Sequence, residues 1–167
     1  MKNRYFFYNN THSYPPFSLD ERFEYFYFTP SLFIRKRHKG IYRHSNLLYF
    51  VWYLLTLGKY KIFYIVDKET KEIAHFSNIM PKIFKYTFMG KYDLQILHCY
   101  TFEKYRGMRL YPSALSEIQG SYNKRDIWIG SHVTNEASIK VIERSGFKRV
   151  CNVQKRTVFG IYRKIDE

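Results

Sequence analysis

The feature that most restricts the fold is a strand, a helix and a second strand in succession between residues 93 and 133. DLQILHCYT at 93–101 has the pattern of a buried strand, and DIWIGSHV at 126–133 has the pattern of another. Two strands joined through a helix run parallel or splay apart within one sheet, because a tight turn joins only antiparallel neighbours. The intervening helix is indicated by one apolar face at helical spacing, made of Leu110, Ala114, Leu115 and Ile118.

The remaining strands are expected to pair as hairpins. KIFYIVD at 61–67 and EIAHFSNIM at 72–80 flank the polar turn KET, and with 93–101 they predict an antiparallel meander. A meander combined with a crossover predicts a mixed sheet flanked by helices, in the α/β (α+β) class. Other predicted elements are a strand at 4–10, a helix at 18–26 capped by Ser18, an apolar helix at 45–57 ended by Gly58, a helix at 136–145, and strands at 147–153 and 156–164.

Length and charge limit the function. A chain of 167 residues is long enough for one domain and short for two, so we expect a single domain over 1–167. The net charge of +14 favours an anionic partner such as nucleic acid, a membrane surface or a phosphorylated small molecule. Because the basic residues look dispersed along the chain, nucleic acid is the weaker expectation.

Several classes of protein are disfavoured by what the sequence lacks. The N-terminus has no apolar run followed by a small-residue cleavage site, so we predict a cytoplasmic protein. The longest apolar run, LLYFVWYLLTL at 47–57, is about half the length of a spanning helix, and we predict a buried or partner-facing helix instead of a membrane span. The two cysteines and six histidines lack metal-ligand spacing, so no metal is predicted.

The segment YRGMRLYP at 105–112 is a candidate anion site. Pro112 is tolerated only in the first turn of a helix, which places the helix start at 109–112. Gly107 allows the chain to bend, and the unpaired amides at the start of a helix attract negative charge. The alternative is an ordinary capped helix with surface arginines.

The whole pattern resembles the GNAT superfamily of acyl-CoA-dependent N-acyltransferases. The order of strand, R-G turn, helix, strand, N-x-x-S helix, G-F and strand is similar over residues 60–165, most specifically over 99–147. The residues that match the family's motifs are Arg106, Gly107, Asn135, Ser138, Gly146 and Phe147. The resemblance implies a mixed, mostly antiparallel sheet, splayed at its centre between 93–101 and 126–133.

The resemblance also implies a site for acetyl-CoA as co-substrate. The pantetheine arm would pair with main chain of Cys99 to Thr101, and Asn135 and Ser138 would lie near the arm from the other side. The pyrophosphate would bind the turn made of Arg106, Gly107, Met108, Arg109, Leu110 and Tyr111. An amine would then attack the thioester directly, with a backbone amide of 93–101 stabilising the oxyanion.

The chain departs from the family at three positions. Arg109 and Tyr111 occupy glycine positions of the turn, and Ile142 replaces a tyrosine that many members place seven residues after the asparagine. We expect Arg109 to have a right-handed helical backbone with its side chain directed outward, where it adds a contact to a phosphate. Since thiols have a reference pKa near 8.5, a thiolate can leave at small cost, with water or Tyr100 supplying the proton.

The general base is less determined, and the candidates are His98, Glu103 and His132. Strand alternation places His98 and Tyr100 on one face, opposite Cys99 and Thr101. A histidine on a strand is more often structural, and Cys99 has no partner spaced to activate it as a nucleophile.

The acceptor is expected to be a small-molecule amine bound by residues 1–60, with an amino sugar preferred over a peptide or polyamine. The oligomeric state is left open, a homodimer included. Two alternatives also stay open: a catalytically silent GNAT-like domain that binds acyl-CoA or a protein, and a basic nucleic-acid-binding module.

Overall fold

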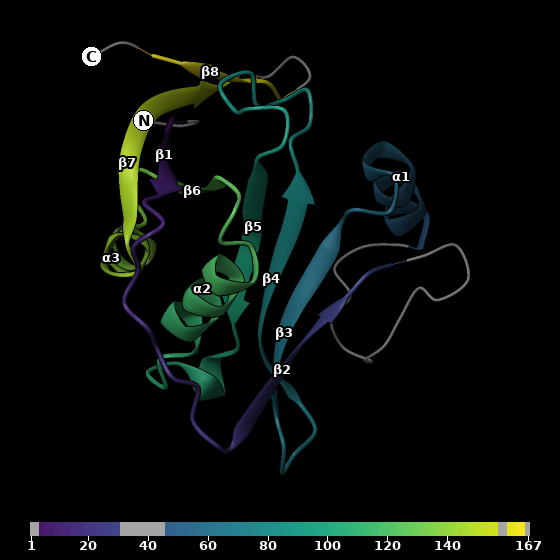
Figure 1. Ribbon diagram of the computed structural model, residues 1–167, viewed down its shortest axis with the longest axis vertical. Helices are drawn as coiled ribbons and strands as arrows, with labels where there is room; N and C mark the ends of the chain where they lie inside the picture. Colours follow the sequence, from purple (N-terminus) through teal and green to yellow (C-terminus); the bar gives the residue numbers. More distant parts are fainter. Residues whose placement is uncertain (1–3, 31–45, 157–159, 166–167) are drawn as a thin grey trace.

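The computed structural model describes residues 4–30, 46–156 and 160–165, which form an eight-stranded sheet with three α-helices (Figure 1). The strands are β1 Arg4–Asn10, β2 Phe23–Phe28, β3 Lys61–Asp67, β4 Ile73–Pro81, β5 Leu94–Thr101, β6 Ile127–His132, β7 Phe147–Lys155 and β8 Tyr162–Lys164. The helices are α1 Asn46–Thr56, α2 Leu110–Ser121 and α3 Glu136–Arg144, with a short 3-10 helix η1 at Glu103–Tyr105.

The sheet has the order β2-β3-β4-β5-β6-β1-β7-β8, and its only parallel pair among the described strands is β5 with β6. That pair holds for three residues of each strand, from Leu94 opposite Ile127 to Ile96 opposite Ile129. Beyond Ile96 the two strands separate. The predicted mixed, mostly antiparallel sheet, splayed between these two strands, is therefore confirmed.

The N-terminal strand is an interior strand of the sheet. β1 lies between β6 and β7 and is antiparallel to both, so residues 4–10 belong to the framework on which the crossover depends. The closing strand β8 is shorter than the predicted segment 156–164 and covers Tyr162–Lys164. Residues 157–159 lie outside the described part of the chain.

The predicted helix at 18–26 is wrong. Residues 23–28 form β2, which pairs with β3 along its whole length. Asp20 makes a turn instead of a helix start, because its carbonyl accepts from the Phe23 amide and its Oδ1 accepts from the Arg22 amide. The aromatic run FEYFYF favours a strand once a neighbouring strand is available, and this tertiary pairing outweighs the local capping pattern.

Helices α2 and α3 pack on one face of the sheet and enclose the main core (Figure 1). Leu110, Leu115 and Ile118 of α2 are inaccessible or nearly so, as is Ile142 of α3. Helix α3 ends as predicted at Gly146, whose φ of +87° reverses the chain, and Phe147 then returns to the core. The helix periodicity of 110–119 and 136–145 is thus confirmed.

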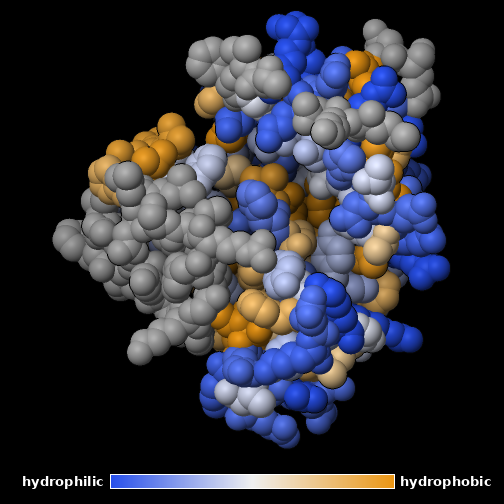
Figure 2. All heavy atoms as spheres, turned by 180° about the vertical axis from the view of Figure 1, so that it is seen from behind, coloured by the Kyte–Doolittle hydropathy of each residue, from blue (hydrophilic) through white to orange (hydrophobic). Residues whose placement is uncertain are grey.

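The helix predicted at 45–57 is present as α1, and Gly58 ends it with a φ of +72° and a bond from its amide to the Tyr53 carbonyl. Its Trp52 ring stacks on Tyr60, on the sheet face opposite α2. Leu54, Leu55 and Leu57 are exposed. Of the two predicted alternatives, a buried or a partner-facing helix, α1 is therefore not wholly buried, and the partner-facing alternative stays a prediction. Figure 2 shows an orange, hydrophobic patch at its upper left. No helix in the described ranges is long and apolar enough to cross a membrane. The basic segment 35–40 lies outside the described residues.

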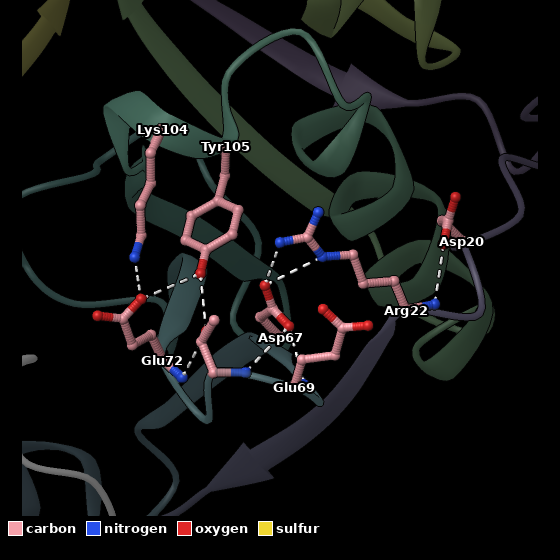
Figure 3. Close-up of polar contacts among 8 residues, drawn as sticks. Asp20, Arg22, Asp67, Glu69, Glu72, Lys104 and Tyr105 are labelled. Carbon is pink, nitrogen blue, oxygen red and sulfur yellow. Dashed lines mark hydrogen bonds and ion pairs between the residues drawn. The ribbon is translucent and has the colours of Figure 1, made fainter.

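A polar network ties three distant segments together (Figure 3). The Arg22 guanidinium donates two hydrogen bonds to Asp67 Oδ2, of 2.6 and 3.0 Å, across β2 and β3. Asp67 Oδ1 also accepts from two amides of the β3–β4 turn, so both oxygens of this inaccessible carboxylate accept hydrogen bonds. Thr70 and Glu72 of the same hairpin then bond the Tyr105 hydroxyl of η1. The network fixes η1 directly before the R-G turn.

We expect Gly146→Ala to destabilise the fold by roughly 2 to 4 kcal/mol, because a Cβ there adds both left-handed strain and an overlap. An added Cβ would lie 2.8 Å from the Ser13 carbonyl oxygen. The matched control is Gly107→Ala, since Gly107 also has a positive φ, of 82°, but no atom within 4 Å of an added Cβ. That control should lose only about 1 kcal/mol. Chemical denaturation measures both; equal losses would contradict the predicted overlap.

The pH dependence of stability should contain a component from Asp67. Its bonds to Arg22, and to the hairpin amides, lower the pKa of this carboxyl from 3.8 to about 2. A folded-state pKa below the unfolded one gives stability that is present above about pH 4 and is lost between about pH 4 and 2. Unfolding of the wild type and of Asp67→Asn, measured across this range, should show a shallower acid loss in the variant. Parallel curves would contradict the assignment.

Candidate active site

A cavity of about 500 Å³ opens where β5 and β6 separate. One wall is β5, a second is η1 with the start of α2, and a third is the start of α3. Its lining residues are Cys99, Thr101, Tyr105, Arg106, Gly107, Arg109, Leu110, Tyr111, Pro112, Asn135, Ala137, Ser138 and Val141. The structure thus brings all the residues predicted for the co-substrate to this cavity except Met108, which is exposed nearby.

The start of α2 forms the entrance to the cavity. Leu110 is the first helical residue and Pro112 lies in the first turn, as predicted. Here Gly107 has a φ of +82° and Arg109, the N-cap, has a φ of +57°. The expectation of a right-handed backbone at Arg109 is therefore wrong, since the chain needs a left-handed residue to enter the helix at this point. This conformation costs a residue with a side chain roughly 1 to 2 kcal/mol relative to glycine.

Two arginines lie at this entrance, and they differ in whether they form an ion pair. The Arg106 guanidinium lies 3.4 Å from the exposed carboxylate of Glu103, one helical turn earlier. Within the part of the chain that the structure describes, Arg109 forms no ion pair. The amides of the first helical turn have no carbonyl to bond within the helix. The positive charges of the arginines and these amide donors therefore lie together at the cavity entrance.

The start of α3 closes the opposite side. The Asn135 side-chain oxygen accepts from the Ser138 amide at 3.2 Å, so the predicted N-cap is formed. The cap uses the backbone amide of Ser138 and not its hydroxyl. The Ser138 hydroxyl lies 3.4 Å from the Tyr111 hydroxyl. Asn135 and Ser138 therefore line the cavity while also serving the helix.

A buried hydrogen-bonded chain lies behind β5. His75 Nδ1 is 2.7 Å from the Thr101 hydroxyl, His75 Nε2 is 2.9 Å from the Ser77 hydroxyl, and Ser77 donates to the Cys99 sulfur at 3.2 Å. Burial lowers the pKa of His75 to about 3, so its ring is neutral at pH 7. A neutral ring with Ser77 donating onward must donate from Nε2 and accept at Nδ1.

Sequence reasoning missed this chain. His75 and Ser77 share a strand face because they are two residues apart, but their partners Thr101 and Cys99 follow only from the β4–β5 register. Burial raises the pKa of the Cys99 thiol to about 11, which keeps it protonated. The expectation that Cys99 is not an activated nucleophile agrees with this environment.

Tyr111 crosses the cavity from α2. Its ring stacks on His75, with the centroids 5.7 Å apart. Its hydroxyl bonds the Cys99 thiol of β5 and faces Ser138 of α3. Burial is the main cause that raises the pKa of this phenol well above its ordinary value, so it remains protonated.

Strand β5 contains an irregularity beside the cavity. Leu97 pairs with Asn78 and Tyr100 with Phe76, so two residues, His98 and Cys99, face the single residue between them. His98 takes up the extra length with a φ of +48° and is exposed.

The bulge sets which side chains face the cavity. Cys99 and Thr101 line it, whereas Tyr100 packs against Phe76 and Phe102 in the aromatic cluster of the other sheet face. His98 Nδ1 lies 3.4 Å from the amide nitrogen of Asn78.

The four residues predicted to act in proton transfer do not share one location, and none lines this cavity. His98 and Tyr100 belong to the opposite sheet face. Glu103 is exposed and paired with Arg106, and His132 packs edge-on against Tyr5 while its Nδ1 lies 2.8 Å from the Thr134 hydroxyl. Across the described ranges, no group of three or more metal-ligating side chains comes together.

Comparison by sequence gives nothing: no protein-family profile matches the chain, and no curated protein does. Comparison by structure finds the GCN5-related N-acetyltransferase from Sphaerobacter thermophilus, with a TM-score of 0.58 at 10% identity over 89% of this chain and 49% of that one. A GNAT-family acetyltransferase from Colwellia psychrerythraea gives 0.57 at 11% identity over 90% and 54%. A tandem GNAT protein from the clavulanic acid biosynthesis pathway gives 0.58 at 10% identity over 88% and 50%.

This chain therefore spans about half the length of these solved structures. The chain has the fold of the GNAT acetyltransferases.

Proposed function

We propose that this chain is an N-acyltransferase that moves an acetyl group from acetyl-CoA to a primary amine by direct attack in a ternary complex. The observation that carries the proposal is the cavity between the splayed strands, which joins a free strand edge to the start of a helix. Such a cavity offers main-chain partners to an extended amide-containing arm and unpaired amides to a phosphate.

The pyrophosphate of the co-substrate would lie on the amides of residues 107–111. Gly107 presents bare backbone, and the dipole of α2 favours negative charge there. Arg106 and Arg109 add two cations at the same entrance. The strain at Arg109 is consistent with a residue held for its charge, since a guanidinium forms strong bonds to phosphate.

The pantetheine arm would extend from this entrance along β5. Past Ile96 no described strand pairs with the edge of β5 that faces β6, while its other edge still pairs with β4. The amides of the arm would lie against this edge, at Cys99 and Thr101, which line the cavity. Asn135 and Ser138 would lie on its other side.

The acyl group would then reach the bulge at His98 and Cys99. A bulge turns one backbone amide out of the ladder, which suits a donor to the oxyanion of the tetrahedral intermediate. The attacking amine loses a proton to a base. None of the predicted candidates His98, Glu103 and His132 lines the cavity, and Tyr100 packs on the other sheet face, so the proposal assigns the proton transfer to none of them. A thiol with a pKa raised to about 11 is a poor nucleophile, which supports direct attack over an acyl-Cys99 intermediate.

The acceptor is proposed to be a small amine, with an amino sugar preferred, bound in part by residues 1–60. β1 itself lies within the sheet, so the segments after it are the candidates for acceptor contacts.

A second candidate, an acyl-CoA-binding domain without transferase activity, is favoured by one observation. Tyr111 stands at a position where the family resemblance implies glycine, and its side chain crosses the cavity. Such a domain would be stabilised by the ligand but would release no thiol.

Acetyl-CoA should stabilise the folded protein. At about 100 times its dissociation constant, a ligand that binds only the native state adds roughly 2.7 kcal/mol. Thermal unfolding with acetyl-CoA, dephospho-CoA or no ligand measures this effect. Absence of any shift at millimolar acetyl-CoA would rule out the proposed function. A thiol-release screen over amino sugars and other amines then separates a transferase from a silent domain.

The variant Arg109→Ala should bind acetyl-CoA about tenfold more weakly, because it loses a bond between two charged groups. Alanine keeps a Cβ, so it leaves the left-handed strain largely unchanged. Lys124→Ala is the control, since it removes the same charge from an exposed position beyond the other end of α2 and should change affinity by less than about twofold. Isothermal titration measures both; equal losses would mean that only net charge matters.

A further inference from the structure

Tyr111 holds a hydroxyl group in the cavity at a fixed position. Its ring is clamped against the buried His75, and its hydroxyl is placed between Cys99 on β5 and Ser138 on α3. The side chain is therefore located by contacts with a strand on one side and a helix on the other.

The hydroxyl already interacts with a sulfur atom. Its bond to Cys99 favours the thiolate over the thiol and acts against the larger effect of burial on the pKa of Cys99. A second sulfur brought to the same place would experience the same stabilisation of its charged form.

Helix α3, on the opposite side of the cavity, has no phenol that could replace the Tyr111 hydroxyl. Ile142 of α3 is fully buried in the core and has no donor. Ser138 is the hydroxyl of α3 that lies near Tyr111, and their separation of 3.4 Å makes it a support for the phenol.

We propose that the Tyr111 hydroxyl turns its single proton from Cys99, which keeps the hydrogen bond from Ser77, to the sulfur of bound CoA and stabilises the thiolate that leaves when the acyl group is transferred. The inference rests on the proposed function, which brings the thioester along β5 to Cys99. Tyr111 thereby acts as a hydrogen-bond donor at the departing sulfur.

The phenol keeps its own proton in this role. The amine nitrogen forms a bond to the thioester carbonyl carbon, the carbon–sulfur bond breaks, and its electron pair stays on sulfur. The proton lost by the amine passes to the base and then to solvent, and the thiolate leaves as such or takes a proton from water. Full transfer from Tyr111 is unfavourable, because its pKa lies well above that of a thiol.

The test compares CoA with desulfo-CoA, which lacks only the thiol, and needs no acceptor. Both dissociation constants are measured by isothermal titration from about pH 7 to about pH 10, across the reference thiol pKa near 8.5. The ratio of the constant for desulfo-CoA to that for CoA isolates the sulfur, since the phosphates are common to both. Burial disfavours the ionised thiol in the site and the Tyr111 hydroxyl favours it, so the readout is the change in this ratio with pH relative to Tyr111→Phe. Between about pH 7 and about pH 10 that change should favour CoA by about 10- to 100-fold more in the wild type, the range for a hydrogen bond to a charged group.

The variant Tyr111→Phe keeps the ring on His75 and removes the hydroxyl, so burial acts on the bound thiol without this donor and the ratio at about pH 10 should be lower than in the wild type. Tyr27→Phe is the matched control, because Tyr27 bonds Ser121 at the other end of α2 and should behave as the wild type. If CoA and desulfo-CoA bind but the ratio changes with pH to the same extent with and without the Tyr111 hydroxyl, the inference alone is overturned. If neither ligand binds the wild type, the proposed function is overturned with it.

Discussion

The separation of β5 from β6 after three paired residues is the constraint on which the rest of the molecule depends. Each strand must still satisfy its backbone groups, because unpaired polar groups in an interior are costly. β6 does so by pairing with β1 on its other side, and β5 by pairing with β4. Beyond Ile96 no described strand pairs with one edge of β5, and the cavity lies beside that edge. The separation of two neighbouring strands thus accounts for the position of the cavity.

Part of the backbone strain in the described residues lies near this opening, while His12, Leu57 and Lys71 have positive φ elsewhere. Gly107 and Arg109 have positive φ at its entrance, and His98 has positive φ at its inner end. Such conformations persist only where the surroundings enforce them. The bulge is fixed by ladder pairs on both sides, and the entrance turn is fixed from beneath by Tyr105, whose hydroxyl is bonded to the β3–β4 hairpin. The network around Asp67 therefore serves the site although it is remote from the cavity.

Patterns with a single local cause could be predicted from the sequence. Helix α3 follows from its cap at Asn135, its periodicity and its glycine stop, each of which acts within a few residues. The helix predicted at 18–26 failed because the same kind of local signal was outweighed by pairing with β3, a strand almost forty residues away. The left-handed Arg109 could not be predicted, since its φ is set by the direction in which the chain must enter α2. The contacts of His75 depend on a register that no local pattern encodes.

Charge is distributed unevenly between the deep wall and the entrance of the cavity, and this difference favours one orientation of a ligand. The deep wall is polar but neutral at pH 7, because burial keeps His75 unprotonated and the Cys99 and Tyr111 hydrogens in place. The entrance is cationic, with Arg106, Arg109 and the start of α2. A ligand with a charged end and a neutral, hydrogen-bonding arm matches this gradient in one orientation only, since reversal would bury its phosphates without a counter-charge. Under the proposed function, the phosphates would therefore lie at the entrance, and the neutral end of the arm would reach the bulge.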